Sequence, residues 1–407
     1  MQKYSIFFVL LVMIIASTMM NPNFLSQQNV TNIAVQLAVA TILAYGEMVL
    51  IVSGLLDLSA GAVLALAGVL SVSVYKSTGN MAMAFAVAIG VAVVFNMINA
   101  LFVANFGLPA FIVTLATQMA ARGLALLYTS GQNILQIGDY AFWGQGKIGG
   151  VFPVPVIFMI VATIVIAYIM NQTRLGRSFY AIGGNEEAAN ASGINVVKSK
   201  YMAFLINGIL VGIAGVLFMA RVNAGLPNGA VGYEMEGLTA AIVGGTSFSG
   251  GIGTTSGTLI GSFIIGCLNN IMNLQGVDSY IQQVVKGIII VGAVLYDVRF
   301  KNKKAPKVIL KKKDEEEKKD DGTAAFPPEI CSRFATGNII MFNHLPMHHL
   351  AAIVQKKFDS CVRMIKDEYD IEMELDDKLP FVFLYHQSGG ADGRKALLHR
   401  VHSRSGA

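Results

Sequence analysis

The stretch AIGGNEEAANASGINVVKSK, residues 181–200, decides how the rest of the chain is interpreted. It is polar, with the adjacent Glu186 and Glu187 and two lysines, yet long runs of Leu, Ile, Val, Ala and Met lie on both sides of it. Apolar runs of about 20 residues can cross a hydrocarbon core about 30 Å thick as helices. The stretch is therefore predicted to be a surface connection between membrane-spanning helices.

The charged residues divide the chain into unlike regions. Residues 1–298 contain 19 of the 55 Asp, Glu, Lys and Arg side chains, and the last 109 residues contain the other 36. A water-soluble surface built from the first region would expose more apolar area than a monomer tolerates. We expect an all-α multi-pass membrane domain over 1–298, a charged linker over 299–323 and a small α/β appendage over 324–407. The net charge of +5 comes mainly from the last 109 residues and does not indicate nucleic-acid binding.

Cysteine and histidine positions exclude several kinds of site. The three cysteines are far apart and lack the C-x-x-C spacing of zinc and redox sites. All six histidines follow residue 343, which excludes histidine relays from the membrane region. His344, His348 and His349 have near-helical spacing, but they lack a catalytic Glu, so a solvated helix face is favoured over a metal site. No catalytic residue and no metal ligand is assigned.

Hydropathy predicts about ten membrane spans. The first run resembles a secretory signal peptide, but no small-x-small cleavage site follows it, so we expect an uncleaved anchor. The spans are predicted near residues 4–20, 32–52, 58–75, 82–104, 110–129, 154–171, 201–220, 236–252, 255–272 and 280–297.

Basic residues predict the orientation of these spans. Four lie between residues 174 and 200, and four more between 299 and 304, after the last span. Cytoplasmic loops carry an excess of Lys and Arg, so both clusters are expected in the cytoplasm. Six spans precede the first cluster and four separate the two, so the N- and C-termini are predicted to be cytoplasmic as well.

A glycine-rich stretch, GGTSFSGGIGTTSGTLIG, occupies residues 244–261. It is not a Walker A loop, because G-x-x-x-x-G-K-[ST] occurs neither here nor elsewhere in the chain. Gly253, Gly257 and Gly261 are spaced by four, which predicts one helix face where another backbone approaches closely. The glycine clusters before them should break the helix, and such backbone at membrane depth is either buried or lines a wet cavity. Close packing and a substrate-lining role both remain open.

Three charged residues lie in or beside apolar runs: Glu47, Asp57 and Arg122. An ionised group at the bilayer centre costs about 2.5–3.5 kcal/mol, so we expect all three to face the protein interior. Asp57 precedes Leu-Ser-Ala-Gly-Ala and is interpreted as a cap of the next helix. Glu47 and Arg122 could form a pair between helices or line a path for a hydroxyl-rich solute.

The polar connection has internal signals for a short helix. Gly183, Gly184 and Asn185 favour a turn, Asn185 is a natural N-cap, and the two glutamates fall in the first turn, where the helix dipole stabilises them. The helix is expected to end at Gly193.

The segment TRLGRSFYAIGGNEEAANASGINV, residues 173–196, resembles the cytoplasmic coupling segment of the ribose and galactose type ABC sugar permeases. VSGLLDLSAG (52–61) is similar to that family's GGIDLSVG segment, and LPAFIVTLATQMAARGLALL (108–127) to its helix with an internal Arg. The long segment from YEMEGL to VLYD, residues 233–297, is similar to its C-terminal signature. Leu55, Leu56 and Asp278 depart from the family pattern. The resemblance implies that ATPase coupling uses Gly184, Asn185, Glu186, Glu187, Ala188, Ala189 and Gly193.

The same resemblance implies a role and a set of partners. The chain would be the permease of a monosaccharide importer in the bacterial inner membrane, with a second permease copy, an ABC ATPase and a periplasmic or extracellular sugar-binding protein. ATP and magnesium would bind to the ATPase, and no cofactor to this chain. The alternatives are a secondary transporter or channel, which needs no ATPase, and a membrane-anchored interaction protein, which moves no solute.

The end of the chain has a separate resemblance. The lysine-rich stretch after residue 298 is interpreted as a disordered linker whose lysines contact membrane lipid. FPPEICSRF and SGGADGRKALLHRV resemble the end of an AAA+ unfoldase module, which places Arg333 at the arginine-finger position and Arg394 in the lid sensor. The fragment lacks a phosphate loop, which excludes an anchored AAA+ machine; a functional fusion and a recombination or gene-model remnant stay open.

Overall fold

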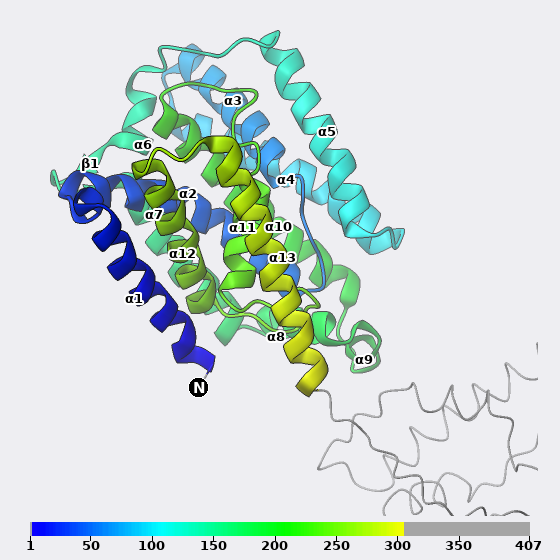
Figure 1. The fold of residues 1–407 in the computed structure, drawn as a ribbon. Helices are drawn as coiled ribbons and strands as arrows, with labels where there is room; N and C mark the ends of the chain where they lie inside the picture. The colour runs from blue at the N-terminus through cyan, green and yellow to red at the C-terminus, as the bar shows by residue number, and fades with distance from the viewer. Residues whose placement is uncertain (1, 305–407) are drawn as a thin grey trace, which may run out of the picture. The chain divides into compact units, whose positions relative to one another are not determined.

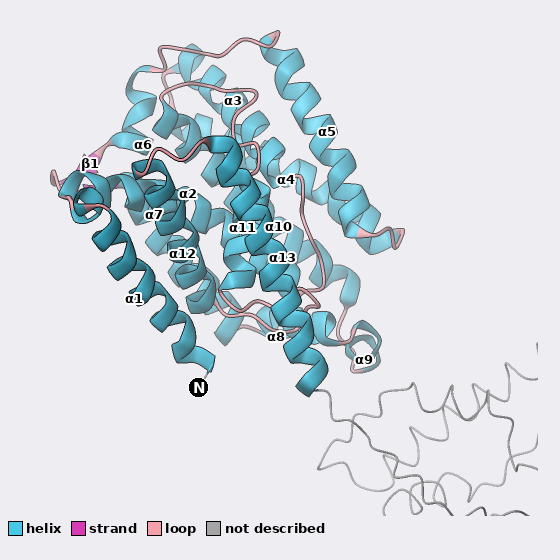
Figure 2. Ribbon diagram, viewed as in Figure 1, coloured by secondary structure: helices cyan, strands magenta, loops and turns pink. Residues whose placement is uncertain are grey.

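The computed structural model describes residues 2–304, which are almost entirely helical (Figures 1 and 2). The appendage over 324–407, with Arg333 and Arg394, and nearly all of the predicted linker lie outside the described residues. The longer helices are α1 (Gln2–Met20), α2 (Gln27–Val52), α3 (Ala60–Thr78), α4 (Met81–Asn105), α5 (Ala110–Thr129), α7 (Val154–Gln172), α10 (Val196–Val222), α12 (Thr255–Leu274) and α13 (Ser279–Lys304).

Several shorter elements complete the described part. The segment between α5 and α7 contains a small antiparallel pair of strands, with Lys147 opposite Pro153. The short elements are η1 (Pro22–Leu25), η2 (Gly138–Ala141), α6 (Phe142–Gln145), β1 (Lys147–Ile148), β2 (Phe152–Pro153), α8 (Arg174–Gly184), α9 (Glu186–Ala191) and α11 (Tyr233–Val243).

A helix is present at each of the ten predicted places, but fewer than ten qualify as membrane spans. Within the described residues, seven helices are long and apolar enough to cross a membrane: α2, α3, α4, α5, α7, α10 and α12. Phe7–Met20 in α1 and Ser279–Leu295 in α13 are shorter apolar stretches. The described part is therefore a multi-pass helical membrane domain, with seven clear candidate spans.

The predicted span over 236–252 is not one continuous helix in the structure. Helix α11 has 11 residues, about 16 Å of rise, which is roughly half of the hydrocarbon thickness. It ends at Val243, with Gly244 as its C-cap, and Gly245 follows with φ +91°. The glycine clusters break the helix as the sequence suggested, but they do so before the span is complete.

Helix α10 is the centre of the packed core, in contact with α2, α3 and α4. Glycines let α4 approach it closely: a Cβ at Gly208 would lie 2.9 Å from Val93 Cα, and one at Gly212 would lie 2.6 Å from Ile89 Cα. Small residues favour this kind of packing in membranes, where there is no hydrophobic force between helices. The close packing leaves nearly every residue of α2 from Leu37 to Val52 buried.

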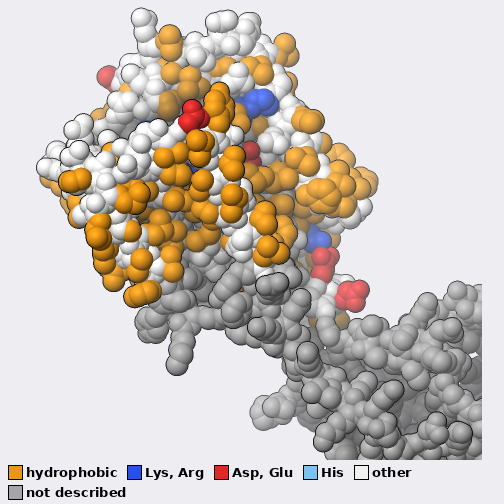
Figure 3. All heavy atoms as spheres, viewed as in Figure 1, with side chains coloured by type: hydrophobic (Ala, Val, Ile, Leu, Met, Phe, Trp, Pro, Cys, Tyr) orange, Lys and Arg blue, Asp and Glu red, His pale blue; other side chains and the backbone are white. Residues whose placement is uncertain are grey.

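The outer helices present large apolar side chains instead. Phe8 on α1, Met119 on α5, Tyr168 on α7 and Ile288 on α13 are all more than half exposed. Figure 3 shows hydrophobic side chains over much of the drawn face, with few charged ones among them. Such a surface is suited to lipid rather than to water.

Candidate functional site: a capped surface helix and a buried polar network

The polar segment begins with two capped helices. Thr173 Oγ1 accepts a hydrogen bond from the Gly176 N–H (3.1 Å) at the start of α8. Asn185 ends α8 and caps α9, because its side chain accepts from the Ala188 N–H (2.9 Å). Glu186 and Glu187 occupy the first turn of α9, as predicted. The caps explain why a helix as short as α9 forms here.

The end of α9 follows the expected glycine pattern. Gly193 has φ +83°, and the Ile194 N–H donates to the Ala189 carbonyl (3.1 Å). A left-handed residue after the last turn is a common way to satisfy the final carbonyls. Ala189 is 4% exposed, so its methyl group packs inward.

The other predicted coupling residues lie at or near the surface. Glu186 is half-exposed and forms an ion pair with Lys200 (2.8 Å), an interaction that contributes little at such a site. Gly184, Glu187 and Gly193 are exposed, and Asn185 and Ala188 are partly buried. The structure therefore brings the seven residues together on one short helix and its two turns.

The three glycines predicted to share a helix face are divided between two elements. Gly257 and Gly261 lie in α12, where a Cβ would overlap the carbonyl oxygens of Gly244 and Ala240 at the end of α11. Gly253 precedes α12, and its carbonyl accepts from the Tyr180 hydroxyl of α8 (2.8 Å). Burial raises the pKa of Tyr180 above its usual value, so the hydroxyl keeps the proton that it donates.

Asp57 is the centre of a buried polar network. It lies in the connection between α2 and α3, where Ser59, rather than Asp57, is the residue just before α3. Asp57 Oδ1 accepts from the Ser59 N–H (2.7 Å) and from the Ser59 hydroxyl, and Oδ2 accepts from Asn207 Nδ2 of α10 (2.7 Å). Asn207 Nδ2 also donates to Asn96 Oδ1 of α4 (2.9 Å). One carboxylate therefore connects α3, α10 and, through Asn207, α4.

The network continues toward α5. Asn99 Nδ2 of α4 donates to the Ser59 hydroxyl (3.3 Å), and the Thr117 hydroxyl of α5 donates to Asn99 Oδ1. These side chains are all at least nine-tenths buried. Buried polar groups are costly unless they are bonded, so these contacts fix the register of four helices.

Glu47 and Arg122 do not form a pair. Glu47 of α2 is fully buried, and neither carboxylate oxygen has a hydrogen-bond partner of normal geometry among the described residues. Arg122 of α5 donates to the carbonyls of Pro227 (2.6 Å) and Gly229 (2.8 Å), which connects α5 to the segment before α11. Both residues face the interior, as an intramembrane charge should.

Further charged residues, which were not predicted from the sequence, also lie in the interior. Glu234 of α11 accepts from Gln118 of α5 (3.3 Å) and from the Gly232 N–H (3.2 Å). Glu236 of α11 pairs with Lys286 of α13. The sequence features that could have revealed these residues are a lone lysine inside the last apolar run and two glutamates at the edge of the predicted span over 236–252.

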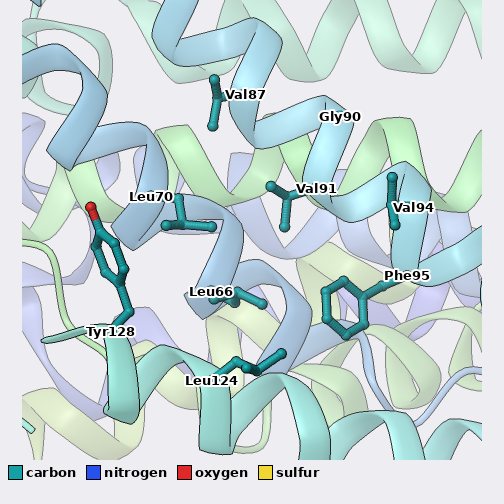
Figure 4. Close-up of a pocket in the computed structure, with 9 residues that line it drawn as sticks. All are labelled: Leu66, Leu70, Val87, Gly90, Val91, Val94, Phe95, Leu124 and Tyr128. Carbon is teal, nitrogen blue, oxygen red and sulfur yellow. The ribbon is translucent and has the colours of Figure 1, made fainter. Parts of the chain in front are cut away.

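No group of three His, Cys, Asp or Glu side chains in residues 2–304 has a metal-binding arrangement. A groove of about 540 Å³ lies between α3, α4 and α5 (Figure 4). Its lining is apolar apart from the Tyr128 hydroxyl, so it offers a sugar almost no hydrogen bonds. The groove is lined by Leu66, Leu70, Val87, Gly90, Val91, Val94, Phe95, Leu124 and Tyr128.

Similarity to known proteins covers the described domain. Residues 29–294 match the family described as branched-chain amino acid transport system / permease component. The chain is 41% identical over 300 residues to the ribose import permease protein RbsC of Bacillus subtilis (strain 168), an alignment that covers 73% of this chain and 93% of that protein. It is 33% identical over 302 residues to the L-arabinose transport system permease protein AraH of Escherichia coli (strain K12), covering 74% and 92%.

A third relative is the D-allose transport system permease protein AlsC of Escherichia coli (strain K12), 36% identical over 300 residues, 72% of this chain and 91% of that protein. No solved structure matches the chain significantly. The match of one family model to most of the membrane domain, together with relatives aligned over nine-tenths of their length, shows that this chain belongs to that family of transport-system permease components.

Proposed function

We propose that the chain is the membrane subunit of an ATP-binding-cassette importer for a monosaccharide, and that a separate ATPase supplies the energy. The named relatives are permeases for ribose, L-arabinose and D-allose, so the proposed cargo is a pentose or hexose. The chain has no Walker A loop of its own. The observation that carries the proposal is the α8–α9 segment, a capped polar helix pair with an exposed face in an otherwise largely apolar membrane domain.

The proposed contact with the ATPase uses the exposed side of α9 and its flanking turns. Glu187 and Gly193 are open to solvent, whereas the Ala189 methyl group holds the helix against the rest of the domain. A short helix with satisfied ends can enter a groove on a partner without losing backbone hydrogen bonds. The proposed coupling residues are Gly184, Asn185, Glu186, Glu187, Ala188, Ala189 and Gly193.

The assembly is proposed to contain two copies of this chain, an ABC ATPase that binds ATP and magnesium, and an external sugar-binding protein, in a bacterial inner membrane. The N- and C-termini are proposed to be cytoplasmic. In support, the start of α1, the α8–α9 segment and the end of α13 lie at the same end of the helical domain (Figure 1). Basic residues gather in and after the α8–α9 segment and at the end of α13, and Lys3 lies at the start of α1.

The test is uptake by the purified complex in proteoliposomes. The permease, the ATPase and the binding protein are reconstituted together, and labelled ribose, arabinose and allose are supplied outside, with ATP and magnesium inside. We expect accumulation that requires all three proteins and ATP hydrolysis. Accumulation by the permease alone would indicate a secondary transporter, and rapid equilibration without ATP would indicate a channel.

The coupling residues have their own test. Glu186→Lys reverses a charge on the exposed face, and Ala189→Leu puts a larger side chain into a 4% exposed position. We expect each to lower uptake at least tenfold while the amount of permease in the membrane stays within twofold of wild type. Lys147→Glu, an exposed charge reversal in β1, is the control. Normal uptake by both variants would contradict this role for α9.

A further inference from the structure

Three distant parts of the chain meet backbone to backbone at Gly183, in the last turn of α8. A Cβ at this position would overlap the carbonyl oxygen of Val52, at the end of α2, and would lie 2.8 Å from the N–H nitrogen of Gly251. Gly251 itself donates to the Val52 carbonyl (2.9 Å). The end of α2, the loop between α11 and α12 and the end of α8 are therefore in direct contact, with no side chain between them.

The loop side of this contact also depends on glycine. Gly250 and Gly251 have φ values of +81° and +72°, which L side chains rarely adopt. A Cβ at Gly250 would collide with the Gly183 carbonyl, and one at Gly251 would lie 2.9 Å from Gly184 Cα. About one turn earlier on α8, the Tyr180 hydroxyl bonds the carbonyl of Gly253 in the same loop (2.8 Å). Close approach is thus built into both sides of the contact.

We propose that Gly183 is a positioning residue for transport: its backbone contact transfers a displacement of α8 to the α2–α3 connection and to the α11–α12 loop at once. This inference rests on the proposed function, because it needs a partner that moves α8. Close-packed backbone does not compress, so a shift of the α8 end displaces Val52 and Gly251 rather than being absorbed.

The two segments in contact with Gly183 lead to the buried charges of the domain. The chain beyond Val52 reaches Asp57 within five residues, and Asp57 is bonded to α10 through Asn207. The loop that contains Gly251 follows α11, which carries Glu234 and Glu236. The contact at Gly183 therefore lies next to the connection that contains Asp57 and close to the end of α11, which carries Glu234 and Glu236.

The test is the number of sugar molecules transported per ATP hydrolysed by the complete complex in proteoliposomes. Gly183→Ala adds the one methyl group that the contact has no room for. We expect transport per ATP to fall at least tenfold, with ATP hydrolysis and ATPase co-purification within threefold of wild type. Gly123→Ala in α5 adds the same group where no atom lies within 4 Å, and it should leave the ratio unchanged.

A second pair of variants decides the question if Gly183→Ala does not fold. Tyr180→Phe removes only the hydroxyl that bonds Gly253, and we expect transport per ATP to fall two- to fivefold. Tyr168→Phe, on an exposed tyrosine of α7, is its control and should have no effect.

Proportional loss of transport and hydrolysis, with less protein in the membrane, would mean that the contact is only structural and would overturn the inference. An unchanged ratio in the folded variants would overturn it as well. ATP-dependent uptake by the wild-type complex is measured in the same experiment, so failure of the proposed function is seen separately, as ATP-independent or absent wild-type uptake.

Discussion

Asp57 and Glu47 are ten residues apart in the chain and both are buried, but their surroundings differ. Asp57 accepts hydrogen bonds from Ser59, two residues later in the same α2–α3 connection, and from Asn207 of the distant helix α10. Glu47 has no partner of normal geometry among the described residues. A buried group that is bonded fixes its neighbours, whereas one that is not bonded destabilises the state in which it is observed. We expect Asp57 to stabilise the fold, and we expect Glu47 to be retained for a reason other than stability.

The largest effect is expected from removing the partner of the bonded carboxylate. Asn207→Ala leaves Asp57 Oδ2 and Asn96 Oδ1 without their shared donor, in positions that water does not reach. Leaving a buried, charged acceptor unpaired costs about 3 kcal/mol. We expect a clear fall in the thermal unfolding temperature of the detergent-solubilised permease.

Asn171→Ala is the matched control, because Asn171 is exposed and bonds only its own helix through the Ala167 carbonyl (2.9 Å). If both variants unfold at the same temperature, Asp57 does not stabilise the fold and the contrast with Glu47 disappears.

The next effect concerns the ion pair between α11 and α13. Lys286→Met keeps the length of the side chain but removes the charge that pairs with Glu236. Hydrogen bonds to charged groups contribute about 2 kcal/mol, and α13 has few other contacts with the domain, chiefly with α11. We expect faster proteolysis within α13 in detergent. Lys147→Met, on an exposed lysine of β1, is the control, and its α13 should be cleaved at the wild-type rate. Equal rates of cleavage in the two variants would contradict the prediction.

A smaller effect is expected at the far end of the Asp57 network. Thr117→Val is nearly isosteric and removes one hydroxyl that donates to Asn99. One hydrogen bond contributes about 1 kcal/mol, so unfolding should shift by a few degrees. Thr31→Val is the control, since the exposed Thr31 hydroxyl bonds the Gln27 carbonyl of its own helix (2.8 Å). A shift as large as that of Asn207→Ala would mean that the network unfolds as a unit.

The contrast between Asp57 and Glu47 also shows what the sequence could predict. Local signals were sufficient for α9, because Asn185, the two glutamates and Gly193 act within a few residues of one another. The apolar runs located the helices, and glycine clusters predicted a break near residue 244. The length of α11 was missed, because hydropathy continues through the Ile-Val-Gly-Gly stretch while the backbone does not.

The hydrogen-bond partners of the interior charged residues could not be predicted from the sequence, for a physical reason. Asp57 and Asn207 are separated by 150 residues, and Arg122 and Gly229 by 107. Which of several helices faces a given side chain depends on packing, here on glycines such as Gly208 and Gly212 that bring α10 to α4. That Glu47, Asp57 and Arg122 face the interior was predictable, but the hydrogen-bond partners of Asp57 and Arg122 were not.

The smallest expected effect on stability is at Glu47 itself, and it tests the contrast most directly. Glu47→Met replaces the carboxylate with an apolar group of similar length, and it removes only a contact with the Asp57 backbone N–H that lacks normal hydrogen-bond geometry. Substitution of an unpaired buried polar group is neutral or stabilising, so the unfolding temperature should stay the same or rise by the equivalent of about 1 kcal/mol.

Uptake measured on the same preparation then separates two possible roles of Glu47. Unchanged uptake would make Glu47 a residue without a function in transport, whereas lost uptake from a protein of full stability would mean that its carboxylate acts in another state of the transport cycle. A loss of stability comparable to that of Asn207→Ala would contradict the prediction, because it would require a bond at Glu47 that matches those of Asp57.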